Sequence, residues 1–177
     1  MDPLNDVQVL VPTNKGVCGV INLNSRIQKM LNPGSTGLLH GNRWFRVGDK
    51  VIQLKNNYNK DIYNGDIGNI TSIDMELKEA SIDYDGRKVD YSFYEMDEIN
   101  HSYAISIHKS QGSEFKCVII PLLTSHYMLL QRNLLYTALT RARELAILVG
   151  SKKAIGMAVN KNIVEKRYTN LKELIQV

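Results

Sequence analysis

The chain has 177 residues, of which 44% are hydrophobic, and its 22 Lys and Arg against 18 Asp and Glu give a formal net charge of +4. That content suffices for the core of one domain, with or without an inserted module, and the weak basic bias only slightly favours polyanionic partners. No apolar run of about eighteen residues and no secretion signature is present, so we expect a cytoplasmic protein that does not contact a membrane.

The first segment predicts a buried strand followed by a helix. Residues 8–12 form a short apolar run closed by proline, which is typical of a strand that ends in a loop, here residues 13–16. Between residues 17 and 31, apolar side chains recur at steps of three and four, which predicts an amphipathic helix. Asn32, Pro33 and Gly34 then end it.

The middle of the chain, residues 44–98, has the pattern of a small all-β module. It contains short, mostly alternating runs at residues 51–54, 67–73, 80–84 and 88–93. Turn residues stand between the runs, and Asp85-Gly86 is the strongest hairpin signal among them. Four or five such strands would close into a barrel of about fifty residues.

Strands and helices alternate again from residue 99 onward. We expect strands at residues 103–107, 118–122 and 145–150, with helices at 131–144 and 151–159. This alternation implies a mostly parallel sheet covered on both faces. The predicted fold class is therefore α/β, with a β-barrel inserted between the two parts of a parallel-sheet domain, residues 1–43 and 99–160. Residues 161–177 form a polar tail that we expect to be mobile or weakly docked.

Two polar clusters carry the chemistry. The first, residues 106–115, reads SIHKSQGSEF and follows a buried strand, where α/β proteins bind ligands. Its hydroxyl groups, imidazole, lysine and glycine backbone suit phosphate oxygens, although a solvated loop would look similar. The second, residues 132–143, is a predicted amphipathic helix that ends in Arg141 and Arg143. An arginine fork there suits a phosphate or a carboxylate, and the alternative is a basic last turn that complements the helix dipole.

Together the clusters closely resemble motifs V and VI of superfamily 1 helicases. The strings YAISIHKSQGSEF and LYTALTRAR, residues 103–115 and 135–143, look like the RecD-like branch, the type of the exodeoxyribonuclease V α-subunit. Residues 9–16 and 19–28 are similar to motif IV and its helix. That branch carries an SH3-like barrel in its second motor domain, and residues 48–53 and 64–68 resemble its opening strands. The resemblance implies a RecA-like domain of the P-loop NTPase type, without the half that carries the P-loop.

The resemblance also implies roles for individual residues at an ATP site. Arg141 would be the arginine finger, which reaches from this domain to the γ-phosphate of ATP bound on the other motor domain. Gly112 and Glu114 match positions that touch the nucleotide, and Lys15 stands where motif IV usually offers it a basic residue.

A second set of positions is implied on single-stranded DNA. Ser106, His108 and Lys109 match positions that face the DNA backbone, and Thr13 of the motif IV loop is assigned with them. Tyr58 lies in an Asn-rich loop of the barrel, where it would stack on a base or stay a simple surface residue.

The sequence lacks parts of a complete motor. Neither a GxxxxGKS or GxxxxGKT loop nor an acidic magnesium motif is present, so ATP and Mg²⁺ would be bound mainly by an N-terminal motor domain of the same polypeptide. We also expect no metal site in this chain, since Cys18 and Cys117 stand apart from each other and from histidines at zinc spacing.

The implied function is that of a fragment of an ATP-dependent 5'-to-3' DNA helicase, inactive as an ATPase alone. The expected partners are single-stranded DNA, the N-terminal motor domain and other recombination or repair proteins. Two alternatives stay open at this point: a stand-alone single-stranded nucleic-acid-binding module, and a fragment of a Pif1-like or conjugative helicase.

Overall fold

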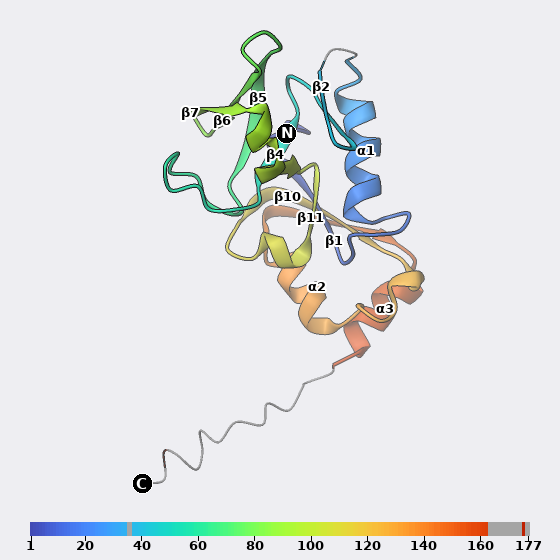
Figure 1. Ribbon diagram of the computed structural model, residues 1–177. Helices are drawn as coiled ribbons and strands as arrows, with labels where there is room; N and C mark the ends of the chain where they lie inside the picture. The colour runs from blue at the N-terminus through green and yellow to red at the C-terminus, as the bar shows by residue number, and fades with distance from the viewer. Residues whose placement is uncertain (35–36, 163–174, 176–177) are drawn as a thin grey trace.

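The structure is a computed structural model that describes residues 1–34, 37–162 and 175. Figure 1 shows a small β region above a sheet-and-helix region, with helix α1 (Val20–Leu31) running along one side of both. Most of the predicted C-terminal tail lies outside the described residues. In the part of the chain that the structure covers, no helix has the length and hydrophobicity needed to cross a membrane.

A parallel sheet forms the centre of the sheet-and-helix region. Its strand order is β11-β10-β1-β9, and every neighbouring pair is parallel. The strands are β1 (Val7–Val11), β9 (Ala104–Ser106), β10 (Phe115–Leu122) and β11 (Ala142–Gly150). The prediction of an α/β domain with a parallel sheet is thus confirmed, with some strand ends displaced by up to three residues.

Helices lie on both faces of this sheet. The helices α2 (Arg132–Leu139) and α3 (Lys152–Asn160) cover one face, where Leu10 and Ile120 of the strands share a core with Leu135. Neighbouring residues of a strand point to opposite faces, so Val9 and Ile119 point to the other face. There they line an apolar pocket together with Ile27 of α1. The segments that flank the β region thus place helices above and below the sheet.

The prediction of a sheet covered on both faces is wrong at strand β11. Leu145, Ile147 and Val149 expose 44%, 39% and 51% of their surfaces. These side chains alternate along the edge strand and point to the face that α1 occupies farther along the sheet, beside β9 and β1. Among the described residues no helix lies over these side chains. Helix α1 packs near β9 and β1, at the other end of the sheet from β11.

The β region, residues 38–101, is built on an antiparallel sheet of strand order β7-β6-β5-β4-β8. Its strands are β4 (Lys50–Gln53), β5 (Ile67–Asp74), β6 (Glu79–Tyr84), β7 (Arg87–Ser92) and β8 (Ile99–His101). A hairpin of β2 (Leu38–His40) and β3 (Arg43–Phe45) and the 3-10 helix η1 (Phe93–Glu98) complete it. We call residues 38–101 the β module. It has its own core, which includes Phe45, Ile82 and Tyr91.

The β module begins and ends differently from the segment 44–98 outlined by sequence pattern. Strand β8 pairs with β4, so residues 99–101 belong to its sheet. The hairpin expected at Asp85-Gly86 joins β6 to β7, and both residues adopt positive φ angles, 54° and 90°. Such angles are those of the tight turns that join twisted antiparallel strands.

Asp49 joins the β module to the parallel-sheet domain. It is fully buried, and its carboxylate accepts hydrogen bonds at 2.6 to 3.1 Å from side chains on both sides, namely Gln28, Asn32, His101 and Tyr103. Burial opposes ionisation, but the donors, of which His101 has the largest effect, hold the pKa of Asp49 below its ordinary value. A buried carboxylate with this many donors fixes the orientation of the β module on the parallel-sheet domain.

Candidate functional site

The segment after β9 turns through the 3-10 helix η2 (Ile107–Ser110). The hydroxyl oxygen of Ser106 accepts a hydrogen bond from the backbone N–H of Lys109 at 3.3 Å and so caps this helix. Ile107 and Ser110 are buried, whereas His108 and Lys109 point outward and are exposed. Desolvation lowers the pKa of the Lys109 amino group. The predicted DNA-facing residues Ser106, His108 and Lys109 therefore lie on one short turn, two of them open to a ligand.

Gly112 lies in the turn that leads from η2 into β10. Its φ angle is +88°, and a Cβ atom built there would meet no atom within 4 Å. The left-handed conformation accounts for a glycine at this position. The open space means that a ligand can approach the backbone closely, as phosphate groups do at glycine-containing turns.

Arg141 lies between α2 and β11, and the helix predicted for residues 131–144 is too long. The helix ends at Leu139, and Arg143 belongs to strand β11. The backbone N–H of Phe115 donates to the carbonyl of Arg141 at 2.8 Å. From this point the chain pairs with β10 instead of continuing as a helix. Arg141 is still held firmly, because its Nε donates to the carbonyl oxygen of Thr137 at 3.3 Å.

Gly112, Glu114 and Arg141 meet at the start of strands β10 and β11. The Nη1 atom of Arg141 donates to the carbonyl of Ser113 at 3.1 Å, and Glu114 forms an ion pair with Arg143 at 3.0 Å. Arg141 is half-buried, and the described residues offer it carbonyl and hydroxyl oxygens but no carboxylate. Its positive charge is therefore available to an anion, while that of Arg143 is compensated.

Lys15 is not brought together with this group. Thr13 and Lys15 follow the carboxyl end of β1, whereas Gly112 and Arg141 adjoin the amino ends of β10 and β11. Because all strands are parallel, these positions lie at opposite edges of the sheet. Thr13 and Lys15 instead lie at the same edge of the sheet as Ser106, which pairs with Val11.

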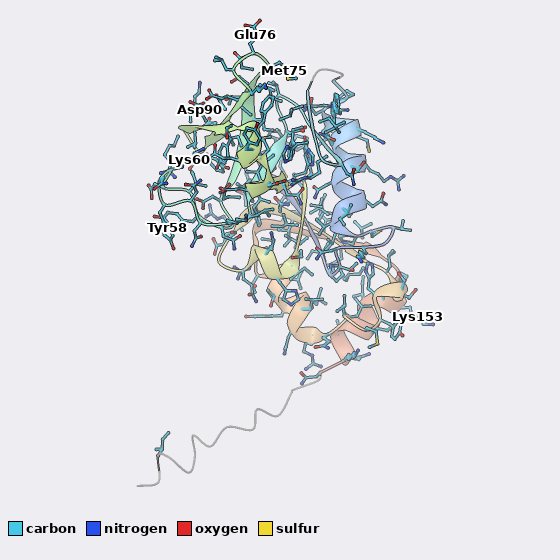
Figure 2. The ribbon with its side chains drawn as sticks, in the orientation of Figure 1. Tyr58, Lys60, Met75, Glu76, Asp90 and Lys153 are labelled. Carbon is cyan, nitrogen blue, oxygen red and sulfur yellow. The ribbon has the colours of Figure 1, made fainter. Side chains whose placement is uncertain are left out.

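Tyr58 lies in the loop between β4 and β5 and exposes 75% of its surface. Its ring meets that of Tyr63 edge to face, with 6.2 Å between centroids, and the side-chain amide of Asn56 donates to its hydroxyl at 3.2 Å. Figure 2 shows Tyr58 at the outer side of the β module, close to Lys60. The predicted aromatic contact thus lies in a loop with internal hydrogen bonds, its ring open to solvent.

Two features of the site are absent from the sequence predictions. The first is the pairing of Arg143 with Glu114, which only the strand register reveals. The second is His126, which is 9% exposed and sits directly after β10 at the carboxyl edge of the sheet. The rule that ligands bind beyond carboxyl ends of parallel strands applies to β10 as well as to β9, and it points to this residue.

Comparison with protein families identifies both parts of the fold. Residues 101–149 match the UvrD-like helicase C-terminal domain, and residues 23–84 match the SH3 domain of ATP-dependent RecD-like DNA helicases. The chain carries a UvrD-like helicase C-terminal domain with a RecD-like SH3 domain. The predicted combination of a RecD-like motor domain with an SH3-like barrel is thereby confirmed.

Curated relatives of the chain also carry RecD names. The chain is 39% identical to the ATP-dependent RecD2 DNA helicase of Deinococcus radiodurans over 170 residues, which are 96% of this chain and 23% of that protein. It is 30% identical over 161 residues to the RecD subunit of the RecBCD enzyme of Mycobacterium tuberculosis, covering 91% of this chain and 28% of that subunit. The chain thus spans about a quarter of the length of these relatives.

Solved structures show the same fold in Pif1 helicases. The crystal structure of Pif1 helicase from Bacteroides in complex with ADP-AlF3 and ssDNA matches with a TM-score of 0.64 at 20% identity, over 95% of this chain and 45% of that one. A structure of two coordinating Pif1 helicases on forked DNA matches with a TM-score of 0.59 at 21% identity, over 97% of this chain and 44% of that one. These helicases share the RecA-like fold of this chain.

Proposed function

We propose that the RecD-like chain is the second motor domain of an ATP-dependent 5'-to-3' DNA helicase. It would supply an arginine finger to ATP held by a first motor domain, and part of the track for single-stranded DNA. Alone it would not hydrolyse ATP. The observation that carries the proposal is Arg141, a firmly held guanidinium without a carboxylate partner among the described residues, in a UvrD-like helicase C-terminal domain.

The arrangement around Arg141 fits the edge of a nucleotide site. A phosphate carries negative charge that Arg141 complements, and the open backbone at Gly112 allows close approach. Glu114 would accept a hydrogen bond from a ribose hydroxyl once its pairing with Arg143 loosens. When bound, Mg²⁺ would neutralise phosphate charge, and the described residues offer no group of three or more acidic, His or Cys side chains to hold it. Mg²⁺ would therefore be held by the first motor domain.

The DNA track would run along the side of the molecule that carries η2. His108 and Lys109 are exposed there, and a lysine beside phosphates contributes to affinity without reading sequence. Tyr58 on the β module would add a stacking surface for a base. Because Asp49 ties the β module to the motor fold, both contacts would move together when the domain moves.

The test separates what this chain does alone from what it does within a full-length polypeptide. Fluorescence anisotropy with labelled oligothymidine is expected to detect salt-sensitive binding by the isolated chain, while a phosphate-release assay detects no ATP hydrolysis. The full-length polypeptide that contains it is expected to hydrolyse ATP when single-stranded DNA is added and to unwind duplexes with a 5' overhang. Hydrolysis by the isolated chain, or no unwinding by the full-length polypeptide, would contradict the proposal.

A further inference from the structure

A second pocket lies beyond the carboxyl edge of the parallel sheet, away from Gly112 and Arg141. It has a volume of about 430 Å³ and is formed by the loop after β1 and the loop after β10. This volume lies within the range of about 300–1,000 Å³ that small-ligand pockets have. Its polar lining comes from Thr13, Lys15, Cys18, Ser125 and His126.

His126 is the unusual member of this lining. Only 9% of its surface is exposed. Its Nδ1 atom is buried without a hydrogen-bond partner among the described residues. Buried polar atoms are nearly always paired, so the unpaired Nδ1 marks a hydrogen bond that the described residues leave unmade, in a residue that lines the pocket. A neutral imidazole ring offers one donor and one acceptor, which suits the polar edge of a nucleobase.

The rim of the pocket is apolar. Val17, Met128 and Leu129 expose 70%, 65% and 41% of their surfaces there. Large apolar side chains around a polar floor provide faces against which a flat heterocycle packs while its edge forms hydrogen bonds. Lys15 is exposed at the same pocket, and the described residues offer it no ion-pair partner. A cation beside a base-sized hollow suits the phosphate that accompanies a base.

The pocket adjoins the turn that carries the candidate DNA contacts. A smaller hollow of about 280 Å³ is lined by His108 and Gln111, and Leu129 lines both hollows. Thr13 and Ser106 also follow neighbouring strands at this edge. A strand that passes over His108 would therefore reach the pocket by crossing Leu129.

We infer that this pocket takes one base of single-stranded DNA, with the base between Met128 and Leu129 above His126 and its phosphate on Lys15. The inference rests on the proposed function and adds to it a place where the strand is gripped by a base rather than by its backbone alone. It also assigns Lys15 to DNA instead of to the ATP nucleotide.

Cys18 provides a direct test because it lines the pocket and is partly exposed, whereas Cys117 is 1% exposed. The rate of alkylation of each cysteine by iodoacetamide is measured by mass spectrometry, with oligothymidine at saturation or with ATP. Oligothymidine is expected to slow the alkylation of Cys18 severalfold, and ATP to leave it unchanged. Cys117 stays unreacted throughout and reports that the fold is intact.

Variants then separate the base from the phosphate. Ser125→Trp fills the exposed mouth of the pocket and is expected to weaken oligothymidine binding about 5- to 100-fold, with little effect on binding of an abasic oligonucleotide of equal length. Lys15→Ala is expected to reduce the slope of log affinity against log salt by about 0.7. Lys29→Ala, at an exposed position in the last turn of α1 and outside the lining of the pocket, is the matched control and should leave both quantities unchanged.

The outcomes distinguish this inference from the proposed function. Oligothymidine that binds without protecting Cys18, or that binds Ser125→Trp as tightly as the unaltered chain, would overturn the pocket while leaving the DNA track in place. Protection of Cys18 by ATP would show that a free nucleotide is the occupant instead and would also overturn it. Absence of any DNA binding would contradict the proposed function and the pocket together.

Discussion

The guanidinium of Arg141 donates a hydrogen bond to the backbone carbonyl of Ser113, with 3.1 Å between Nη1 and the oxygen. Ser113 stands between Gly112 and Glu114, so the cation and the other two candidate nucleotide contacts form one unit. The backbone bond from Phe115 to the Arg141 carbonyl reinforces it. A change at Arg141 should therefore affect both the charge at this site and the position of its neighbours.

Replacing Arg141 by Ala in the full-length polypeptide is expected to lower DNA-stimulated ATP hydrolysis about 10³- to 10⁵-fold, because an arginine finger stabilises charge that develops in the transition state. Affinity for ATP should change far less. Steady-state phosphate release gives the rate, and a fluorescent nucleotide gives the affinity. Arg132→Ala, an exposed arginine at the start of α2, is the control. A rate within a factor of a few of wild type would mean that Arg141 is not the arginine finger of the ATP site.

Glu114→Ala is expected to act differently from Arg141→Ala. A carboxylate that holds the ribose binds the substrate and the transition state equally, so its loss raises KM for ATP severalfold and leaves kcat nearly unchanged. Glu144, exposed on β11, is the matched control for Glu→Ala at this edge. A fall in kcat with constant KM would instead assign Glu114 to the chemical step.

Local patterns were enough to predict most strands and the hairpin of the β module. The alternating runs on either side of Asp85-Gly86 form β6 and β7, because turn geometry and strand periodicity are encoded within a few residues. The short apolar run before Pro12 forms β1 for the same reason. The motif resemblance then indicated the helicase family, which composition and periodicity leave open.

Features set by contacts between distant segments escaped prediction. Apolar side chains continue at helical spacing through Ala142, yet that residue pairs with Phe115 and extends β11 instead of α2. The separation of Lys15 from Arg141 likewise follows from strand direction and register. The pocket around His126 joins two loops more than a hundred residues apart, as their numbers in the sequence show. No local pattern encodes any of these.

Asp49→Asn is expected to lower the free energy of unfolding by about 3–5 kcal/mol, because the buried donors around it lose a charged acceptor. Urea denaturation followed by fluorescence measures the change. Asp85→Asn is the control, since asparagine tolerates the positive φ of that exposed turn equally well. A loss below about 1 kcal/mol would mean that the hydrogen bonds at Asp49 contribute little to holding the β module on the parallel-sheet domain.

The lowered pKa of Asp49 gives this contribution a pH dependence. A carboxyl group whose folded pKa lies below its unfolded value stabilises the fold at pH above the unfolded pKa, about 3.9. The stabilisation is lost as the pH falls through the lower, folded value. The difference in stability between the unaltered chain and Asp49→Asn should therefore shrink in acid.

Tyr58→Ala is expected to weaken oligothymidine binding about 5- to 100-fold if a base stacks on its ring. The free energy of unfolding should stay within about 0.5 kcal/mol, since the ring is 75% exposed. Tyr94→Ala is the control, because that ring is 88% exposed on the same β module and lies outside the loop of Tyr58. Equal affinities for the two variants would exclude stacking at Tyr58.

Because Lys50 is buried, the free energy of unfolding should rise with pH in mildly alkaline solution. Lys50 is 5% exposed, its Nζ donates to the Val7 carbonyl at 3.2 Å, and burial lowers its pKa to about 8. The unfolded chain keeps this proton up to about pH 10.4, so between the two values it binds more protons and stability rises with pH. From about pH 7.5 to 9.5 the gain is about 2 kcal/mol at 1.36 kcal/mol per pKa unit.

Lys50→Met keeps the volume of the side chain and removes this titrating group, so its stability should rise less with pH over this range than that of the unaltered chain, in which Lys109 also has a lowered pKa. The measurement has to stop below about pH 10, because burial raises the pKa of Tyr84 and Tyr103. A raised tyrosine pKa means that the unfolded chain loses those protons first, and stability then falls as pH rises. A flat profile for the unaltered chain between about pH 7.5 and 9.5 would mean that Lys50 stays charged where it is buried.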